Sequence, residues 1–266
     1  MSSYVLFIDS GIGGLSILDY FINMKKDVNV IYYADTKNFP YGTKDEETIG
    51  NFLLNIYIGL KEKYNISLIV VACNTASVSA LEFLREKVKI KVIGTVPAVK
   101  VASDITRNNK IGVIATENTV KLNYLSNLIQ QFAKNKQVFV KASGLLVEAA
   151  ENQYSNEKLQ EVMQKELSFF KEKEIDCLVL GCTHYSFLID MIDEFFEKKV
   201  KVVDSRDGVS RRIIELLPSS AVNKNPKRFL YLSKGSDGIV EKYQGFNEML
   251  KLFDEIIVKD LSCQKV

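Results

Sequence analysis

Residues 67–77 read S-L-I-V-V-A-C-N-T-A-S, an apolar run that ends in Cys73 and two polar residues. Much later, residues 176–186 read D-C-L-V-L-G-C-T-H-Y-S, an apolar run that ends in Cys182. The two cysteines lie 109 positions apart, and each has a serine four residues further on. Each sits where a short strand pattern gives way to a helix pattern. We therefore expect the chain to build the same cysteine-bearing turn twice.

A second landmark repeats at almost the same spacing. Residues 7–10 read F-I-D-S, and residues 113–116 read V-I-A-T, 106 positions later. Two independent landmarks that recur at nearly one spacing indicate an internal duplication. The copy is imperfect, because Ala115 stands where the first half has Asp9.

Strand patterns alternate with helix patterns along the chain, which predicts an α/β protein with mostly parallel sheets covered on their faces. We expect strands at residues 4–8, 28–33, 68–71, 89–95, 110–115, 137–142, 175–180, 201–204, 228–232 and 255–258. We expect helices at residues 15–24, 43–64, 75–87, 99–106, 118–132, 155–173, 185–198 and 206–217, and a turn at 144–148. The run V-P-A at residues 96–98 suggests a domain crossing, with a return near residues 204–207. The expected domains are residues 1–95 with 208–266, and residues 96–207.

Composition limits the classes of function. Hydrophobic residues make up 47% of the chain and charged residues 26%, as in ordinary globular proteins. The net charge of +2 is too small to argue for a nucleic-acid or membrane partner. The first residues read as a strand that contains Asp9, not as a secretion signal, and no apolar run approaches the roughly 20 residues of a membrane span. Free thiols then predict a reducing, cytoplasmic location.

Polar loops follow two of the early strands. Asp9 and Ser10 open the run D-S-G-I-G-G, just before a helix pattern, at the edge where open α/β sheets bind ligands. A dinucleotide loop would need a third glycine, but Ser16 stands there. We prefer a tight turn whose N–H groups face a small anion. The second loop, residues 36–43, contains P-Y-G.

The cysteines differ in their surroundings. Free cysteine is usually buried and inert, and we expect this of Cys177 and Cys263. Cys73 and Cys182 instead sit at strand ends beside hydroxyl and amide groups, where a helix N-terminus favours the thiolate. Zinc is disfavoured because His184 is the only histidine and no two-residue gap joins the cysteines. The C-x-x-C pattern of disulfide exchange is absent.

Two thiols from two similar halves suit racemisation, which removes a proton from one face of a carbon and returns one to the other. One cysteine acts as base while the other acts as acid, in either direction. Asp9 could assist Cys73, and His184 with Glu148 could assist Cys182. The alternative for Asp9 is a turn or cap residue, and for Glu148 a solvated helix acid.

Six stretches in order resemble the glutamate racemase family. They are D-S-G-I-G-G-L (9–15), P-Y-G (40–42), A-C-N-T-A-S (72–77), V-P-A-V-K (96–100), L-V-E (146–148) and L-G-C-T-H-Y (180–185). Each is weak alone, but six in this order are specific. Together they span the chain up to about residue 207, and the stretch after about residue 218 matches weakly. Ser186 departs from the proline that many relatives carry, away from the chemistry.

The resemblance implies a cofactor-independent enzyme, without a metal, that makes D-glutamate for peptidoglycan. It implies two α/β domains related by a pseudo-twofold, with the active site in the cleft between them, and we expect a homodimer acting on free glutamate. Cys73 and Cys182 would be the proton donors and acceptors, assisted by Asp9, Glu148 and His184. The implied substrate contacts are Asp9, Ser10, Tyr41, Gly42, Asn74, Thr75, Thr116, Thr183 and His184.

Three other hypotheses remain open. An aspartate racemase would share the chemistry and differ in the pocket for the side-chain carboxylate. A non-catalytic binding protein on this scaffold would be expected to lose one thiol, whereas both are present. A thiol hydrolase using Cys182 and His184 would leave Cys73 without a role.

Overall fold

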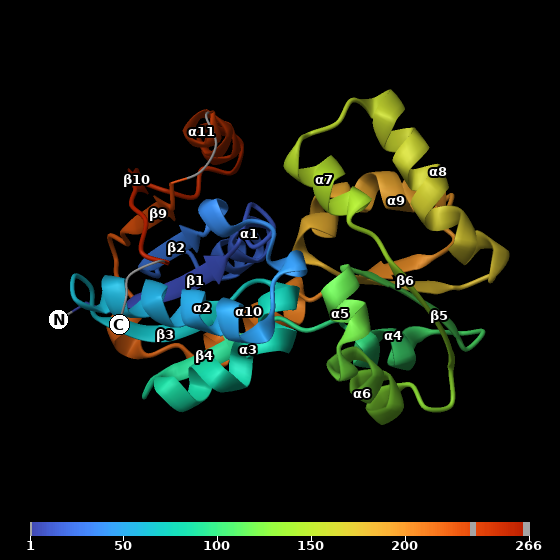
Figure 1. Ribbon diagram of the computed structural model, residues 1–266, viewed down its shortest axis with the longest axis horizontal. Coiled ribbons are helices and arrows are strands. Elements are labelled where there is room, and N and C mark those ends of the chain that lie inside the picture. The colour runs from blue at the N-terminus through green and yellow to red at the C-terminus, as the bar shows by residue number, and fades with distance from the viewer. Residues whose placement is uncertain (1, 235–237, 263–266) are drawn as a thin grey trace. The chain divides into compact units, whose positions relative to one another are not determined.

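The chain folds into two compact units, each built around its own parallel sheet. The computed structural model describes residues 2–234 and 238–262. The first unit comprises Met1–Thr95 and Arg206–Val266, and the second comprises Val96–Ser205. The chain therefore leaves the first unit once and returns to it, so the first unit is discontinuous in sequence (Figure 1).

The first unit contains a six-stranded sheet in the order β10-β9-β2-β1-β3-β4, with every neighbouring pair parallel. Its strands are β1 (Tyr4–Asp9), β2 (Val30–Ala34), β3 (Ile66–Val71), β4 (Lys91–Gly94), β9 (Arg228–Leu232) and β10 (Glu255–Val258). Its helices are α1 (Leu15–Met24), α2 (Glu46–Lys61), α3 (Asn74–Lys87), α10 (Arg206–Leu216) and α11 (Ile239–Leu250). Short 3-10 turns are η1 (Thr36–Asn38), η2 (Tyr41–Thr43) and η4 (Ser219–Ala221).

The central strands of this sheet are buried on both faces. Residues 5–9 of β1, all of β2 and residues 68–71 of β3 are buried. This explains why they read as continuous apolar runs instead of alternating patterns. Helix α2 begins where Asp45 accepts hydrogen bonds from the Thr48 backbone N–H at 2.8 Å and from the Thr48 hydroxyl at 2.7 Å.

The second unit contains a four-stranded parallel sheet in the order β6-β5-β7-β8. Its strands are β5 (Lys110–Ala115), β6 (Gln137–Ala142), β7 (Cys177–Gly181) and β8 (Lys201–Val203). Its helices are α4 (Val99–Ile105), α5 (Glu117–Lys121), α6 (Asn123–Phe132), α7 (Leu145–Glu151), α8 (Asn156–Glu172) and α9 (Ile189–Phe195), with one 3-10 helix, η3 (Thr183–Leu188). The mostly parallel α/β class expected from the sequence is confirmed.

The two sheets share one strand order, because β2-β1-β3-β4 corresponds to β6-β5-β7-β8. Equivalent backbone hydrogen bonds close the carboxyl edge of each sheet. The Asp35 N–H donates to the Asp9 carbonyl at 2.8 Å, and the Ser143 N–H donates to the Ala115 carbonyl at 2.9 Å. The repeated spacing in the sequence therefore reflects a repeated supersecondary unit.

Three expected elements of the second unit differ from the structure. The helix expected at residues 118–132 is broken into α5 and α6, because Leu122 is extended with φ −74° and ψ 142°. The helix expected at 185–198 begins as the 3-10 helix η3 and continues as α9. The turn expected at 144–148 is the start of α7, which the Ser143 hydroxyl caps by accepting from the Leu146 N–H at 3.2 Å.

The other cysteines were expected to be inert. Cys177 is fully buried, and burial followed by the nearby Asp176 charge raises the pKa of its thiol to about 12. The expectation for Cys263 falls on residues 263–266, outside the part of the chain that the structure describes. Within the described part, no helix is both long and apolar enough to cross a membrane.

Candidate active site

Cys73 lies at the start of α3, two residues beyond the end of β3. It is the N-cap residue, with φ −119° and ψ 123°, and its side chain is 8% exposed. The Ser77 hydroxyl donates to the Val71 carbonyl at 3.0 Å and accepts from the Thr95 N–H at 2.8 Å. These bonds join the first turn of α3 to the ends of β3 and β4. The thiol is therefore held at a helix N-terminus, which stabilises negative charge on sulfur.

Asp9 lies at the end of β1, next to β3 in the sheet. Its carboxylate is fully buried and accepts from the Gly11 N–H at 3.1 Å and the Ser10 hydroxyl at 3.4 Å. A Cβ on Gly14 would lie 2.8 Å from the Ala72 Cβ and 3.0 Å from the Asp9 carboxylate. Only glycine therefore lets the start of α1 approach both Asp9 and the residue before Cys73.

Asn74 carries an unsatisfied polar group beside Cys73. Its side chain is 2% exposed, and its Nδ2 has no hydrogen-bond partner among the described residues. Buried polar groups in native proteins almost always have partners, so an orphaned donor calls for a ligand or water. Thr75 and Ser10 are buried in the same unit, and both have hydroxyl groups. The expected substrate contacts on this unit thus include one donor free to bind an oxygen.

The P-Y-G loop forms η2, in which Tyr41 is buried and Gly42 is half-buried. The Tyr41 hydroxyl donates to the Asp35 carboxylate at 2.7 Å. Burial, then the Asp35 charge, raises the pKa of Tyr41 well above its usual value, and the charges of Cys73 and Asp9 add to the rise. Tyr41 therefore lies within electrostatic reach of both groups, but its hydroxyl is committed to Asp35.

Cys182 occupies the equivalent position in the second unit, directly after β7 and at the N-cap of η3. Its sulfur lies 3.8 Å from Nδ1 of His184, and the other ring nitrogen, Nε2, lies 2.8 Å from a carboxylate oxygen of Glu151. The three side chains are each less than a tenth exposed. They form a buried cysteine–histidine–glutamate chain in which the carboxylate orients the imidazole.

Hydrogen bonding sets the protonation state of His184. Burial alone would lower the pKa of His184, but its hydrogen bonds to Cys182 and Glu151 outweigh burial and raise the pKa to about 10. The imidazole is therefore protonated at neutral pH. A charged imidazole against the sulfur can stabilise negative charge that forms there during proton transfer.

The acid that partners His184 is Glu151, so the expectation that Glu148 would do so is wrong. Glu148 is exposed on α7, whereas Glu151 is 7% exposed. The sequence predicts a turn at residues 144–148, whereas the structure has the helix α7 there. In a helix, residues four apart share a face, so the buried Val147 predicts that Glu151 also points inward. The helical spacing was the signal that could have identified Glu151.

The remaining residues expected on the second unit are buried near the same sheet edge. Thr116 is the N-cap of α5, and its hydroxyl lies 2.9 Å from that of Thr119. Thr183 is the first residue of η3 and is buried. Tyr185 donates its hydroxyl to the Ser143 carbonyl at 2.5 Å, which fixes η3 against the end of β6. Thr116 therefore follows the carboxyl end of β5, and Cys182, Thr183 and His184 follow that of β7.

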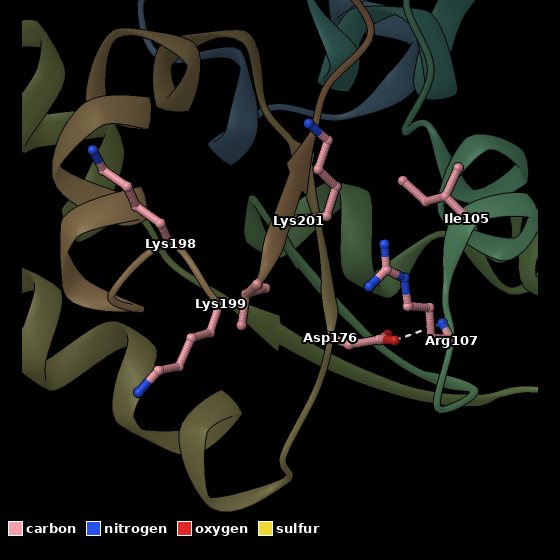
Figure 2. A pocket seen from close by; sticks show the side chains of 7 residues that line it. Ile105, Arg107, Asp176, Lys198, Lys199 and Lys201 are labelled. Carbon is pink, nitrogen blue, oxygen red and sulfur yellow. Dashed lines mark hydrogen bonds between the residues drawn. The ribbon is translucent and has the colours of Figure 1, made fainter.

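A separate hollow of about 410 Å³ opens at the opposite edge of the second sheet, where Asp176 precedes β7 and Lys201 begins β8 (Figure 2). Both carboxylate oxygens of Asp176 are bonded within the protein, to the Thr106 hydroxyl and to the backbone N–H groups of Arg107 and Asn108. Figure 2 shows the side chains of Lys198, Lys199 and Lys201 pointing in different directions. None of the candidate residues line the hollow, so it is not the thiol site.

The described residues do not group into a metal-binding site. Among residues 2–234 and 238–262, no group of three or more histidine, cysteine, aspartate or glutamate side chains is placed to hold a metal ion. The candidate groups are instead two thiols with their assisting residues, Asp9 in one unit and His184 with Glu151 in the other.

Comparison with known proteins places this geometry in a family. The sequence model of the Asp/Glu/hydantoin racemase family matches residues 23–208. Glutamate racemase of Shewanella woodyi is 38% identical over 248 residues, covering 90% of this chain and 93% of that protein. These relatives confirm the expected enzyme class, an isomerase of the amino-acid racemase type.

Solved structures agree with the sequence relatives. Escherichia coli glutamate racemase, in complex with L-glutamate and the activator UDP-MurNAc-Ala, has a TM-score of 0.88 at 33% identity, covering 97% of this chain and 98% of that one. Glutamate racemase of Aquifex pyrophilus has a TM-score of 0.77 at 33% identity, covering 96% and 98%. The chain therefore belongs to the Asp/Glu/hydantoin racemase family.

Proposed function

We propose that the protein is a glutamate racemase that interconverts L-glutamate and D-glutamate without a cofactor, using Cys73 and Cys182 as the two proton-transferring groups. The observation that carries the proposal is the duplication of the thiol centre. Each cysteine is the N-cap after a central strand, at equivalent places in two units of one strand order. The sequence relatives that are named glutamate racemases support the choice of substrate.

In the proposed reaction, the thiolate of one cysteine removes the Cα proton of glutamate. The electron pair left on Cα is then protonated from the opposite face by the thiol of the other cysteine. The first thiolate has become a thiol and the second thiol a thiolate, so the two exchange roles for the reverse direction. In the substrate only the Cα–H bond is broken and re-formed, while one S–H bond forms as the other breaks, so no oxidant or reductant is needed.

Each thiol has its own assisting group in the proposal. Asp9 serves Cys73, because Asp9 ends β1 and Cys73 lies just beyond the adjacent strand β3. Asp9 and Ala72, the residue before Cys73, both approach Gly14 closely. His184 serves Cys182 at 3.8 Å, oriented by Glu151, which replaces Glu148 in this role. The two halves therefore use different chemistry, a buried carboxylate on one side and a charged imidazole on the other.

Hydrogen-bond donors hold the substrate carboxylates in the proposal. The orphaned Asn74 amide is the clearest candidate, since a carboxylate oxygen would satisfy it. Ser10, Thr75, Thr116 and Thr183 provide hydroxyl groups, and the turn formed by Tyr41 and Gly42 provides backbone groups. The proposed reaction requires that both cysteines reach Cα of one bound glutamate, from opposite faces. We further propose a cytoplasmic homodimer that supplies D-glutamate for peptidoglycan.

The test is deuterium exchange at Cα. The protein is incubated in D2O with L-glutamate, and separately with D-glutamate, without added pyridoxal phosphate. Circular dichroism then follows loss of optical activity, and proton NMR follows loss of the Cα proton. We expect both enantiomers to racemise and to gain deuterium. Exchange of aspartate but not glutamate would retain the mechanism and overturn the substrate, whereas no exchange with either would favour a binding protein.

A further inference from the structure

Asp35 is a buried carboxylate outside the proposed proton-transfer groups. It follows β2 directly and is fully buried. Its carboxylate accepts from the Tyr41 hydroxyl at 2.7 Å, the Ser233 hydroxyl at 3.1 Å and the Asn38 amide at 3.0 Å. Burial raises its pKa, and these hydrogen bonds, with one from Ser262, oppose the rise. A buried carboxylate held by several donors and no cation is costly unless all of the donors stay in place.

The Tyr41 turn is the element that this carboxylate fixes. Tyr41 is 1% exposed, and its ring stacks on Phe52 with centroids 6.0 Å apart. The turn η2 contacts α3, whose N-cap is Cys73, and Tyr41 and Cys73 belong to one buried cluster. Because the hydroxyl proton is committed to Asp35, Tyr41 can contribute to substrate binding through its ring, through its oxygen as an acceptor and through the backbone of the turn. The placement of that backbone depends on Asp35.

The support for Asp35 comes from the far end of the chain. Ser233 directly follows β9, and its hydroxyl also accepts from the Lys37 N–H at 2.8 Å. Ser262 accepts from Asn38 at 2.8 Å, and its carbonyl accepts from Asn55 on α2 at 3.1 Å. Both serines lie beyond residue 208, where the family match ends. Residues outside the family match therefore brace a loop that lies inside it.

The last described residues are attached to the sheet by another tyrosine. The Tyr33 hydroxyl donates to the Lys259 carbonyl at 3.1 Å and accepts from the Leu261 N–H at 2.8 Å. Leu261 is buried against Gly59, where an added Cβ would lie 2.9 Å from a Leu261 methyl group. We call residues 259–262 the C-terminal clasp. Tyr33 thereby fixes the clasp. The Tyr64 hydroxyl bonds instead with that of Tyr231 at 2.8 Å, which makes Tyr64 a control outside the clasp.

We propose that Asp35 is a positioning residue for the substrate site, and that Ser233 and the C-terminal clasp complete the hydrogen bonding that holds the Tyr41 turn beside Cys73. The inference rests on the proposed function, because it assigns the turn to glutamate binding. It predicts that loss of this support weakens substrate binding more than it slows proton transfer.

The test compares Asp35→Ala, Asp35→Asn, the double variant Ser233→Ala/Ser262→Ala, and the control Tyr64→Phe. For each, kcat and KM are measured with both glutamate enantiomers, together with the melting temperature. We expect Asp35→Ala to raise KM by about tenfold or more with a smaller change in kcat. Asparagine can still accept from the Tyr41 hydroxyl, so Asp35→Asn should raise KM far less than Asp35→Ala does. The double variant should raise KM by a few-fold.

Tyr64→Phe loses the bond between Tyr64 and Tyr231 and should lower the melting temperature while leaving KM unchanged. An unchanged KM in both Asp35→Ala and the double serine variant would overturn the inference. So would an equal rise of KM in Tyr64→Phe, since the effect would then be general loosening. If Asp35→Ala does not fold, Tyr41→Phe removes the same hydrogen bond and should reproduce the rise. Failure of the wild-type protein to exchange glutamate would instead overturn the proposed function.

Discussion

The two cysteines are the residues on which the proposed reaction depends. We expect Cys73→Ala and Cys182→Ala each to abolish racemisation, because each direction needs a base on one face and an acid on the other. Serine at either position should leave a trace at most, since a hydroxyl is a far weaker acid than a thiol. Circular dichroism of either glutamate enantiomer measures the rate. Cys177→Ala is the matched control and should keep its activity, because that thiol is buried within β7. Full activity in either Cys73→Ala or Cys182→Ala would exclude the two-base mechanism.

The charge of His184 makes a second prediction at this scale. Its pKa is about 10 in the folded protein and about 6.5 in an unfolded chain. The folded state therefore binds this proton more tightly. Its contribution to the free energy of unfolding is fully present below about pH 6.5 and is lost as the pH rises through about 10. Denaturant unfolding between pH 6 and pH 10 should show this decline.

Glu151→Gln removes the negative charge that helps to keep His184 protonated. The free energy of unfolding should then decline less between pH 6 and pH 10, and proton transfer at Cys182 should be slower. Glu148→Gln changes an exposed acid on the same helix and should behave like the wild type in both measurements. A pH dependence that is the same in all three proteins would show that the bond between Glu151 and His184 does not set the imidazole charge.

The sequence was enough to identify most of the candidate residues but not all of their contacts. Cys73, Cys182, Asp9 and His184 stand at strand ends as predicted, because a strand-end residue is fixed by local pattern alone. Glu151 was missed because its role depends on which face of α7 is buried. The commitment of the Tyr41 hydroxyl to Asp35 was missed because it joins two loops through tertiary packing.

At the scale of elements, the start of α1 depends on one glycine, Gly14, the N-cap residue of that helix. We expect Gly14→Ala to destabilise the protein by about 1–3 kcal/mol, because the added carbon would lie 2.8 Å from both the Ala72 Cβ and the Tyr32 hydroxyl. Displacing these groups also moves Asp9, so activity should fall. Denaturant unfolding measures the first effect, and the racemisation rate measures the second.

Gly245 in α11 provides the comparison for this substitution. A Cβ there would meet nothing within 4 Å, so Gly245→Ala should stabilise the protein slightly and leave activity unchanged. A Gly14→Ala protein as stable and as active as Gly245→Ala would show that the close approach at α1 is not needed.

Boundaries of elements were predictable where local signals act. Strands β5, β6, β9 and β10 have the predicted bounds. The break between α5 and α6 and the 3-10 form of η3 were not predicted. A tertiary contact holds η3, because the Tyr185 hydroxyl bonds the Ser143 carbonyl, 42 positions away.

At the scale of the whole molecule, the first unit needs both ends of the chain. β9 lies between β2 and β10 in the sheet, and Leu230, Tyr231 and Leu232 are buried. We expect a protein truncated after residue 208, where the family match ends, to lose cooperative unfolding of the first unit. Denaturant unfolding followed by near-ultraviolet circular dichroism tests this, since nine of the twelve tyrosines lie in the first unit. A truncated protein that unfolds like the full chain would show that β9 and β10 are dispensable.

The sequence predicted the repeated architecture but not how the chain closes the first sheet. Alternation of strands and helices fixes parallel pairing, and the repeated spacing indicates two similar halves. The placement of β9 beside β2 joins residues about 200 positions apart, and no local pattern encodes such a pairing.

The discontinuous first unit has a consequence for synthesis on the ribosome. The second unit is contiguous, and all of its residues, 96–205, have been made before β9 and β10 exist. Translation thus delivers a complete second sheet while the first still has an open edge at β2 and no clasp under the Tyr41 turn. The half that is encoded first is the half that finishes folding last. A nascent chain carries both cysteines long before it carries the residues that support its substrate loop.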